Sequence, residues 1–240
     1  MTHQIFHDES YQNTFTALVS GLDDQNHGLI LDQTAFYPGG GGQPSDHGWL
    51  IINGNEIQLC SVKKISGKIV HVLPDEVSLP ELESSLEGKL DWKRRYQLMR
   101  THTAMHILCG TIFRDYGASV TGGNMEPLKG RMDFEFSSLK KEFVQIIENS
   151  VNLEIKKGLP VNWRVIPREE AFQIPDLIRT KINLLPPQIS EVRVVEIIGL
   201  DLQADGGTHV KNTKEVGGIK ITDYKSKGRE NKRVYLEIIE

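Results

Sequence analysis

The 240-residue chain has little cysteine, no long apolar run and no excess of basic side chains. Cys60 and Cys109 are its two cysteines, so no disulfide framework is expected, and each is predicted to be a small buried hydrophobic residue. No run of eighteen apolar residues occurs, and the opening stretch MTHQIFHDES lacks the apolar core of a signal peptide. We therefore expect a cytoplasmic protein with no membrane partner.

The charge balance excludes a globally cationic nucleic-acid-binding protein. The chain has 28 Lys and Arg against 32 Asp and Glu, a formal charge of -4. Any nucleic-acid partner must therefore meet a local basic patch. Two clusters are candidates for phosphate contacts, and each could equally be a solvated charged face. They are Lys93, Arg94, Arg95 and Arg100, and then Lys225, Lys227, Arg229, Lys232 and Arg233.

Residues 14–73 alternate short apolar stretches with turn residues. INGNE and ISGK within this region are typical of hairpin turns between strands. The pattern predicts a barrel or a strongly bent sheet. We place a domain boundary near Asp91, which gives a β-rich domain over 1–90 and a second domain over 91–240.

The second domain is predicted to mix helices with antiparallel strands. From Trp92 to Phe113, apolar residues recur at spacings of three and four, and Gly117 is the predicted end of the helix. Beyond it, GRMDFEFSS, LPVNWRVIP and EVRVVEIIG predict strands, LKKEFVQIIENSVNLEIKKG and REEAFQI predict helices, and the last residues predict a hairpin with a basic loop. This is an α+β pattern.

Two histidines stand four residues apart inside the predicted helix. His102 and His106 would lie one turn apart on one face, which is the geometry that two imidazoles need to bind a single metal ion. Chance is a serious competitor, because eight histidines in 240 residues would give about a quarter of one such pair. His3 and His7 form a second pair at a terminus, and we treat that pair as chance.

Further ligands are offered by the stretch DLQADGGTHV. Its Gly-Gly turn would let Asp205 and His209 converge on one ion. Three histidines and a carboxylate would bind zinc, although a carboxylate is a harder ligand than a thiolate. The residues alone leave open that His102 and His106 are ordinary core or surface residues.

Four consecutive glycines occur in TAFYPGGGGQPSDHG. Their entropic cost on folding suggests a close approach of the backbone to a ligand, and a flexible hairpin loop is the alternative. No Gly-Lys-Ser/Thr follows and no helix-opening GxGxxG is present, so a P-loop is excluded and no nucleotide cofactor is expected.

In this order, TAFYPGGGGQPSDHG, RTHTAMHILCG, VTGGNM, RMDFEF and DGGTHV resemble the editing module of alanyl-tRNA synthetase and its freestanding relatives, the AlaX proteins. The resemblance covers nearly the whole chain and is greatest to the medium-length type. It implies an α+β protein with a β-barrel-like N-terminal domain, followed by an α/β two-layer editing domain with an antiparallel sheet. It also implies a trans-editing hydrolase that binds the acceptor end of mischarged tRNA(Ala) and removes chiefly serine, or glycine in some members.

The resemblance further implies one zinc ion per chain. The HxxxH motif of the family falls on His102 and His106, and its CxxxH motif falls on Asp205 and His209. Asp205 departs from the family, in which cysteine is usual; it can ligate zinc through one oxygen, or the metal can keep three histidines and additional water. HTAMH lacks the glutamate of HExxH, which argues against a metalloprotease.

An aminoacyl ester needs no serine or cysteine nucleophile, because a zinc ion with an open position can polarise the carbonyl or deliver water. Selectivity for serine over alanine requires a hydrogen bond to its hydroxyl, and Thr34 and Gln43 are the candidates, with purely structural roles as the alternative. The resulting assignment is His102, His106, Thr34 and Gln43 as catalytic residues, with Gly40, Gly41, Gly42, Thr208 and Arg229 as substrate-binding residues.

Two other functions stay open at this point. Asp205 would also suit a member that has lost catalysis and remains a tRNA-binding or metal-binding module. Editing of another aminoacyl-tRNA, such as threonyl-tRNA, is the second alternative, against which FYPGGGGQPSD favours the alanyl type. The sequence does not decide between a monomer and a homo-oligomer.

Overall fold

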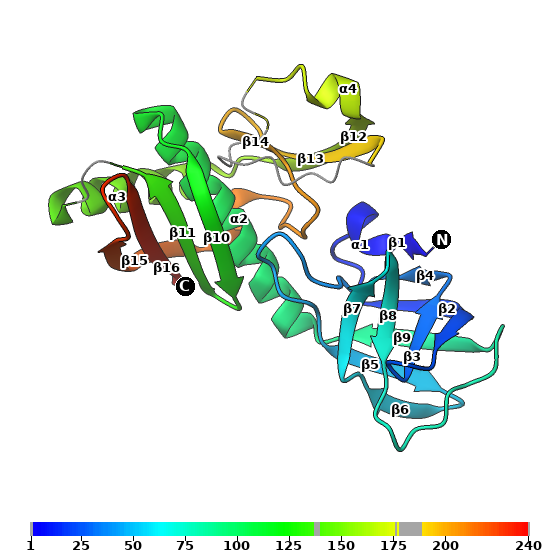
Figure 1. The fold of residues 1–240 in the computed structure, drawn as a ribbon. Helices are drawn as coiled ribbons and strands as arrows, with labels where there is room; N and C mark the ends of the chain where they lie inside the picture. The colour runs from blue at the N-terminus through cyan, green and yellow to red at the C-terminus, as the bar shows by residue number, and fades with distance from the viewer. Residues whose placement is uncertain (1, 137–139, 176, 178–188, 240) are drawn as a thin grey trace. The chain divides into compact units, whose positions relative to one another are not determined.

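The computed structural model describes residues 2–136, 140–175, 177 and 189–239. The chain divides into two compact units, Met1–Gln97 and Leu98–Glu240, and each is described by itself (Figure 1). The predicted boundary near Asp91 stays a prediction. None of the helices in the described ranges is long and apolar enough to cross a membrane.

The first unit is built on a bent seven-stranded sheet (Figure 1). Across the sheet, the strands are β6 (Asn55–Gln58), β5 (Gly48–Ile52), β9 (Ser85–Leu90), β2 (Thr14–Asp23), β3 (Gly28–Leu31), β8 (Lys68–Val72) and β7 (Ser61–Ile65). The long β2 pairs with β9 through its first half and with β3 through its second half, and a register shift lies between Val19 and Gly21. This irregularity bends the sheet into a half-barrel, as the alternating sequence predicts.

Short elements complete the first unit. β1 (His3–Gln4) pairs in parallel with β4 (Gln33–Thr34), and α1 (Ile5–Asp8) follows β1. The core contains alternate residues of the strands, among them Phe15, Leu29 and Leu50. In β2, β5 and β9, buried residues alternate with more exposed ones, so one face of each of these strands turns toward the core.

Both predicted hairpin turns of the first unit are confirmed. Asn53 and Gly54 join β5 to β6 with φ values of 51° and 79°. Ser66 and Gly67 join β7 to β8 with φ values of 47° and 82°. Two successive positive φ angles are typical of the two-residue turn whose twist matches that of the flanking strands.

The second unit combines two antiparallel sheets with helices, which confirms the α+β class (Figure 1). One sheet has the order β10 (Val120–Glu126), β11 (Lys129–Glu135), β16 (Asn231–Ile239) and β15 (Gly218–Ser226). The other has the order β12 (Val161–Pro167), β13 (Glu191–Ile197) and β14 (Asp201–Ala204). The helices are α2 (Trp92–Tyr116), which begins in the first unit, α3 (Lys141–Lys157), α4 (Arg168–Ala171) and the 3₁₀ helix η1 (Thr213–Val216).

Helix α2 is the central element of the second unit. Its residues 101–112 are all buried, and Gly117 ends it with a φ of 65° and an N–H donated to the Phe113 carbonyl, as predicted. At Gly110, an added Cβ would lie 2.8 Å from the carbonyl oxygen of Leu200 and 3.0 Å from the Cβ of Asp201. A glycine here lets the start of β14 lie directly against the helix.

The expectation for the cysteines is half right. Cys109 on α2 is buried, as predicted, whereas Cys60 is exposed. Cys60 comes directly before β7, and its N–H is donated to the Val72 carbonyl of β8. The prediction was wrong for Cys60, which lies at a bend between the buried residues Leu59 and Val62 with its side chain in solvent.

Candidate metal centre

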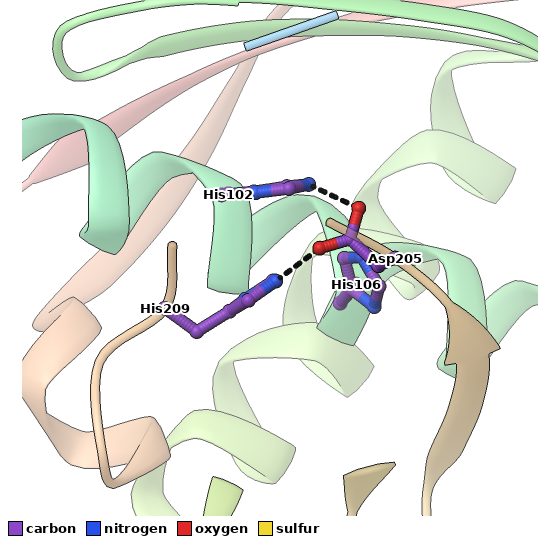
Figure 2. A group of neighbouring side chains, drawn as sticks. All are labelled: His102, His106, Asp205 and His209. Carbon is purple, nitrogen blue, oxygen red and sulfur yellow. Dashed lines mark hydrogen bonds and ion pairs between the residues drawn. The ribbon is translucent and has the colours of Figure 1, made fainter. Parts of the chain in front are cut away.

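Three histidine rings lie against one another in the second unit (Figure 2). His102 and His106 lie one turn apart on α2, with ring centroids 5.1 Å apart. The ring of His209 stacks on His102 at 4.2 Å and lies 4.8 Å from His106. All three residues are buried. The two histidines of the helix and the distant His209 therefore form one cluster.

Asp205 completes the cluster. Its carboxylate lies between the rings of His102 and His209, with Oδ1 3.5 Å from Nε2 of His102 and Oδ2 2.9 Å from Nε2 of His209 (Figure 2). One ligand atom from each of the four residues lies within 4.8 Å of the other three. Three imidazole nitrogens and a carboxylate oxygen therefore converge on a volume that one metal ion could occupy.

Neighbouring side chains orient the imidazoles. Nδ1 of His106 lies 2.8 Å from Oδ2 of Asp201 on β14, and since a carboxylate only accepts, Nδ1 carries the proton and donates. Oδ2 of Asp201 also accepts from Nε2 of Gln203 at 2.8 Å. This arrangement leaves the lone pair of Nε2 of His106 for a metal, as carboxylate–histidine pairs do around metal ions.

His209 is held in a similar way. Its Nδ1 lies 3.2 Å from Oγ1 of Thr103 on α2, and that oxygen also accepts the N–H of Val210 at 3.2 Å. Nε2 of His209 lies 2.9 Å from Oδ2 of Asp205, and since a carboxylate only accepts, Nε2 carries the proton here and Nδ1 accepts from the Thr103 hydroxyl. A metal ion held at Nε2 would replace that proton. Candidate ligands from a helix and from a distant loop are thus connected by hydrogen bonds to the same threonine.

The loop that carries Asp205 and His209 is fixed by Arg193 of β13. Nη1 of Arg193 donates to the carbonyl oxygens of Asp205 and Gly207 at 3.0 and 3.1 Å. The N–H of Asp205 is in turn donated to the carbonyl of Arg193 at 3.1 Å, and the N–H of Gly207 is donated to Oδ2 of Asp205 at 2.8 Å. Thr208, a predicted substrate-binding residue, is fully buried in this loop.

The environment sets the protonation of the cluster. Burial lowers the pKa of His102 well below its usual value, and it lowers the pKa of His209 to about 4. Burial alone would raise the pKa of Asp205, but the neighbouring His102 and the hydrogen bond from His209 hold it well below its usual value. Neutral imidazoles beside an ionised carboxylate are the protonation states that coordinate a metal ion.

The glycine run forms an ordered hairpin in the first unit. Gly39, Gly40, Gly41 and Gly42 all have positive φ angles, of 85°, 145°, 57° and 90°. Gly40 and Gln43 exchange two backbone hydrogen bonds, of 3.0 and 2.9 Å, and the Tyr37 hydroxyl donates to the Gly40 carbonyl at 3.1 Å. The run is therefore a closed turn with a defined backbone, and its predicted contact with substrate stays a prediction.

Thr34 and Gln43 also belong to the first unit, and both are buried. Oγ1 of Thr34 lies 2.9 Å from Nε2 of His71 and accepts the N–H of Phe36 at 3.1 Å. Burial lowers the pKa of His71 to about 4, so its ring is neutral at neutral pH. The candidate metal centre is formed by residues of the second unit, and the catalytic role assigned to Thr34 and Gln43 stays a prediction.

Comparison with known proteins places the chain. It is 40% identical over 240 residues to the alanyl-tRNA editing protein AlaX-M of Saccharolobus solfataricus, with 99% of each chain covered. The chain belongs to the AlaX-M family. It is also 36% identical over 246 residues to the protein of that name from Methanosarcina acetivorans, with all of both chains covered.

Two family descriptions match parts of the chain. Residues 5–94 match tRNA synthetases class II (A), and residues 192–235 match the threonyl and alanyl tRNA synthetase second additional domain. Asp205 and His209 fall within the second match. The alanine–tRNA ligase of Pyrobaculum neutrophilum is 36% identical over 227 residues, which cover 92% of this chain and 25% of that enzyme.

In the first basic cluster, Arg95 has a structural role. Arg95 is fully buried, and its Nε donates to both carboxylate oxygens of Asp46 at 3.0 Å. Asp46 also accepts the N–H of Tyr37 at 2.7 Å, so the pair fixes both ends of the glycine hairpin. Arg95 cannot contact a phosphate, which corrects the expectation from its position in a basic run.

The second basic cluster includes both paired and exposed side chains. Arg233 donates to both oxygens of Asp133 at 2.6 and 2.7 Å, and buried Lys232 donates to the carbonyl of Gly228 at 2.7 Å. Lys227 and Arg229 are exposed between β15 and β16. Arg229, a predicted substrate-binding residue, is therefore accessible, and its role stays a prediction.

Proposed function

We propose that the protein hydrolyses the aminoacyl ester of mischarged tRNA(Ala), chiefly Ser-tRNA(Ala), with one zinc ion per chain. The observation that carries the proposal is the convergence of His102, His106, His209 and Asp205 within 4.8 Å. The alignment with AlaX-M relatives, over 99% of both chains in one case, supports action in trans. The acceptor end of tRNA(Ala) is the proposed partner.

The donor set fits zinc. Three imidazole nitrogens and one carboxylate oxygen suit a borderline ion with four ligands, and they suit magnesium or calcium poorly, because those ions prefer oxygen. When bound, zinc supplies a Lewis acid that polarises an ester carbonyl or acidifies water. No side chain has to become covalently bonded to the amino acid, because the ester is already activated.

The surrounding residues set the geometry of that chemistry. Asp201 keeps the proton of His106 on Nδ1, and Thr103 contacts Nδ1 of His209, so Nε2 of each ring would be the atom that holds the ion. The N–H of Gly207 holds Asp205 in place through Oδ2. Asp205 is the proposed fourth ligand in the position where cysteine is usual in the family.

Selectivity is proposed to lie with hydrogen bonds to the serine hydroxyl. A buried polar group that bonds this hydroxyl would reject alanine by about 10⁴-fold in a favourable case, which an apolar pocket cannot do. Thr34 and Gln43 are the proposed partners, with Gly40, Gly41, Gly42 and Thr208 contacting the aminoacyl end and Arg229 contacting a phosphate.

The test is deacylation of Ser-tRNA(Ala), Gly-tRNA(Ala) and Ala-tRNA(Ala) by the purified protein, before and after chelation and after zinc is restored. We expect zinc-dependent release of serine with little release of alanine. His102→Ala should reduce serine release by more than about 100-fold, whereas His3→Ala, a matched change at an exposed histidine, should not. Serine release equal to that of the chelated protein would reject the proposal.

A further inference from the structure

Trp163 is a large apolar side chain that the fold leaves partly in solvent. It lies on β12, the edge strand of the sheet β12–β13–β14, and is 40% exposed. Val165, two residues further on the same face, is 49% exposed. Adjacent exposed apolar side chains on an edge strand mark a surface that a partner covers more often than scattered single residues do.

The exposed ring lies on the face of the sheet that supports the metal centre. Trp163 pairs with Val195, and Val195 pairs with Gln203. Directly paired residues of antiparallel strands point to the same face, so Trp163 and Gln203 share a face, two strand spacings or about 10 Å apart. Gln203 bonds Asp201, which orients His106.

Arg193 connects Trp163 to the ligand loop. The Cζ atom of Arg193 lies 5.4 Å from the centroid of the Trp163 ring. Nη1 of the same guanidinium donates to the carbonyls of Asp205 and Gly207. The ring is therefore held by a cation–π contact to the side chain that fixes the loop of Asp205 and His209.

The chemistry of the proposed substrate indicates which group could cover the exposed Trp163 ring. The ester to be cleaved and the unpaired 3′-terminal base of a tRNA are attached to the same ribose. When the ester carbonyl is at the metal centre, the base must lie within the length of one nucleoside from it. Unpaired bases in protein complexes stack on aromatic rings and on arginine planes, and the arginine adds positive charge near the phosphate.

We propose that Trp163, in cation–π contact with Arg193, is the stacking platform for the 3′-terminal base of the tRNA acceptor end. This inference rests on the proposed function, because it assigns the base of the same substrate whose ester lies at the metal centre. Trp163 acts in binding and positioning, and the metal ligands perform the chemistry. A change at Trp163 therefore raises KM more than it lowers kcat.

The direct test uses uncharged tRNA(Ala) whose terminal adenosine is replaced by fluorescent 2-aminopurine, with the full-length protein. Stacking quenches the emission of 2-aminopurine. We expect quenching by the unchanged protein and by Trp163→Phe, which keeps an aromatic face. With Trp163→Leu, which keeps an apolar side chain, we expect loss of quenching and about tenfold weaker binding.

Phe172 provides the matched control. It is 47% exposed and carries the Arg168 guanidinium 4.7 Å from its ring centroid, and Nη1 of Arg168 donates to the carbonyl of Ile189, outside the ligand loop. Phe172→Leu should leave quenching and affinity unchanged. Equal effects of the two leucine variants, or full quenching by Trp163→Leu, would overturn the proposal and indicate that the exposed tryptophan serves another partner.

Failure of the inference can be told apart from failure of the proposed function. If unchanged protein releases serine from Ser-tRNA(Ala) but Trp163→Leu has the same KM and quenching, the inference alone fails. If the unchanged protein neither releases serine nor quenches the probe, both fail. Circular dichroism and thermal unfolding of each variant check that the fold is retained, and Trp163→Phe gives a result even if the leucine variant does not fold.

Discussion

The two units bury polar side chains in opposite ways. In the first unit, Arg95 and Asp46 neutralise each other, and Arg95 also donates to backbone carbonyls, including that of Ser10 at 2.9 Å. In the second unit, four side chains that could each supply a ligand atom to a metal ion lie within 4.8 Å of one another. Two opposite charges that pair with each other have no charge left over to attract a ligand. Several nitrogen and oxygen atoms that can each share a lone pair, gathered in one place, favour the binding of a cation.

The difference also affects stability. A buried ion pair is held by the mutual attraction of its charges, so removing one partner leaves an uncompensated charge in the interior. Neutral imidazoles carry no such charge, and one can be removed at a smaller cost. Mutation of the ion pair should therefore reduce mainly the stability of the fold, and mutation of the histidine cluster should reduce mainly ligand binding.

The largest expected effect comes from breaking the ion pair. Asp46→Ala leaves the guanidinium of Arg95 buried without its carboxylate, so we expect the free energy of unfolding to fall by about 3–5 kcal/mol. The double change Asp46→Leu with Arg95→Met removes both charges and should recover much of this loss. Chemical denaturation monitored by circular dichroism measures both. A single variant as stable as the unchanged protein would contradict the assigned role of the pair.

The next effect concerns His71, whose pKa is about 4 in the folded protein. In the unfolded chain, a histidine has a pKa of about 6.5, so between these values the unfolded state binds more protons. The contribution of His71 to stability is fully present above pH 6.5 and is lost as the pH falls toward 4, by about 3 kcal/mol in all.

The measurement for His71 is the unfolding free energy at several pH values for unchanged protein and for His71→Gln. We expect the difference between the two proteins to shrink by that amount between pH 6.5 and 4. Subtracting the unfolding free energies of the two proteins cancels the pH-dependent contributions of His102 and His209, which both proteins share. A difference that does not change with pH would show that His71 is not neutral in the fold.

The smallest expected effect is on the zinc affinity of the second unit, and it tests the role of Asp205. If Asp205 ligates zinc, Asp205→Cys should retain or tighten binding, because a thiolate is the softer ligand, and Asp205→Ala should weaken it about tenfold or more. Zinc dissociation constants of the three proteins decide this. Asp223, an exposed carboxylate on β15, gives the control variant Asp223→Ala. Equal affinities for the unchanged protein and for Asp205→Ala would indicate a three-histidine site.

Local features of the fold were predictable from the sequence. The apolar spacing of three and four and the position of Gly117 predict α2 almost to the residue, because helix period and chain termination are local properties. β10 was not predicted, since its Gly122 and Gly123 are poor strand formers alone. It forms because it pairs with β11. At Gly123 the absence of a side chain also leaves room for Met105, whose Cε would lie only 3.2 Å from an added Cβ.

The four residues of the candidate metal centre were predicted from the sequence, but the residues that support them were not. His102, His106, Asp205 and His209 stand in recognisable motifs, and the structure brings all four together. Asp201 contacts His106 across 95 positions of sequence, and this contact depends on the close approach of β14 to Gly110. The only available signal was the string DLQADGGTHV, in which Asp201 and Gln203 share a strand face with no motif of their own.

Partners of buried charges were equally hidden. Arg95 stands in a run of basic residues, which gives no hint that it is fully buried. Its partner Asp46 lies 49 positions away in the glycine-rich stretch. Charge patterning identifies which residues are cationic, but the fold decides which of them meet a carboxylate.

The four glycines of the hairpin also have a stereochemical consequence. With every φ angle from Gly39 to Gly42 positive, the segment follows a path that suits mirror-image amino acids. Any L-residue there costs about 1–2 kcal/mol from chirality alone, even at Gly41, where an added Cβ would meet no atom within 4 Å. The composition of this run is therefore set by the handedness of its backbone, independently of any molecule that binds beside it.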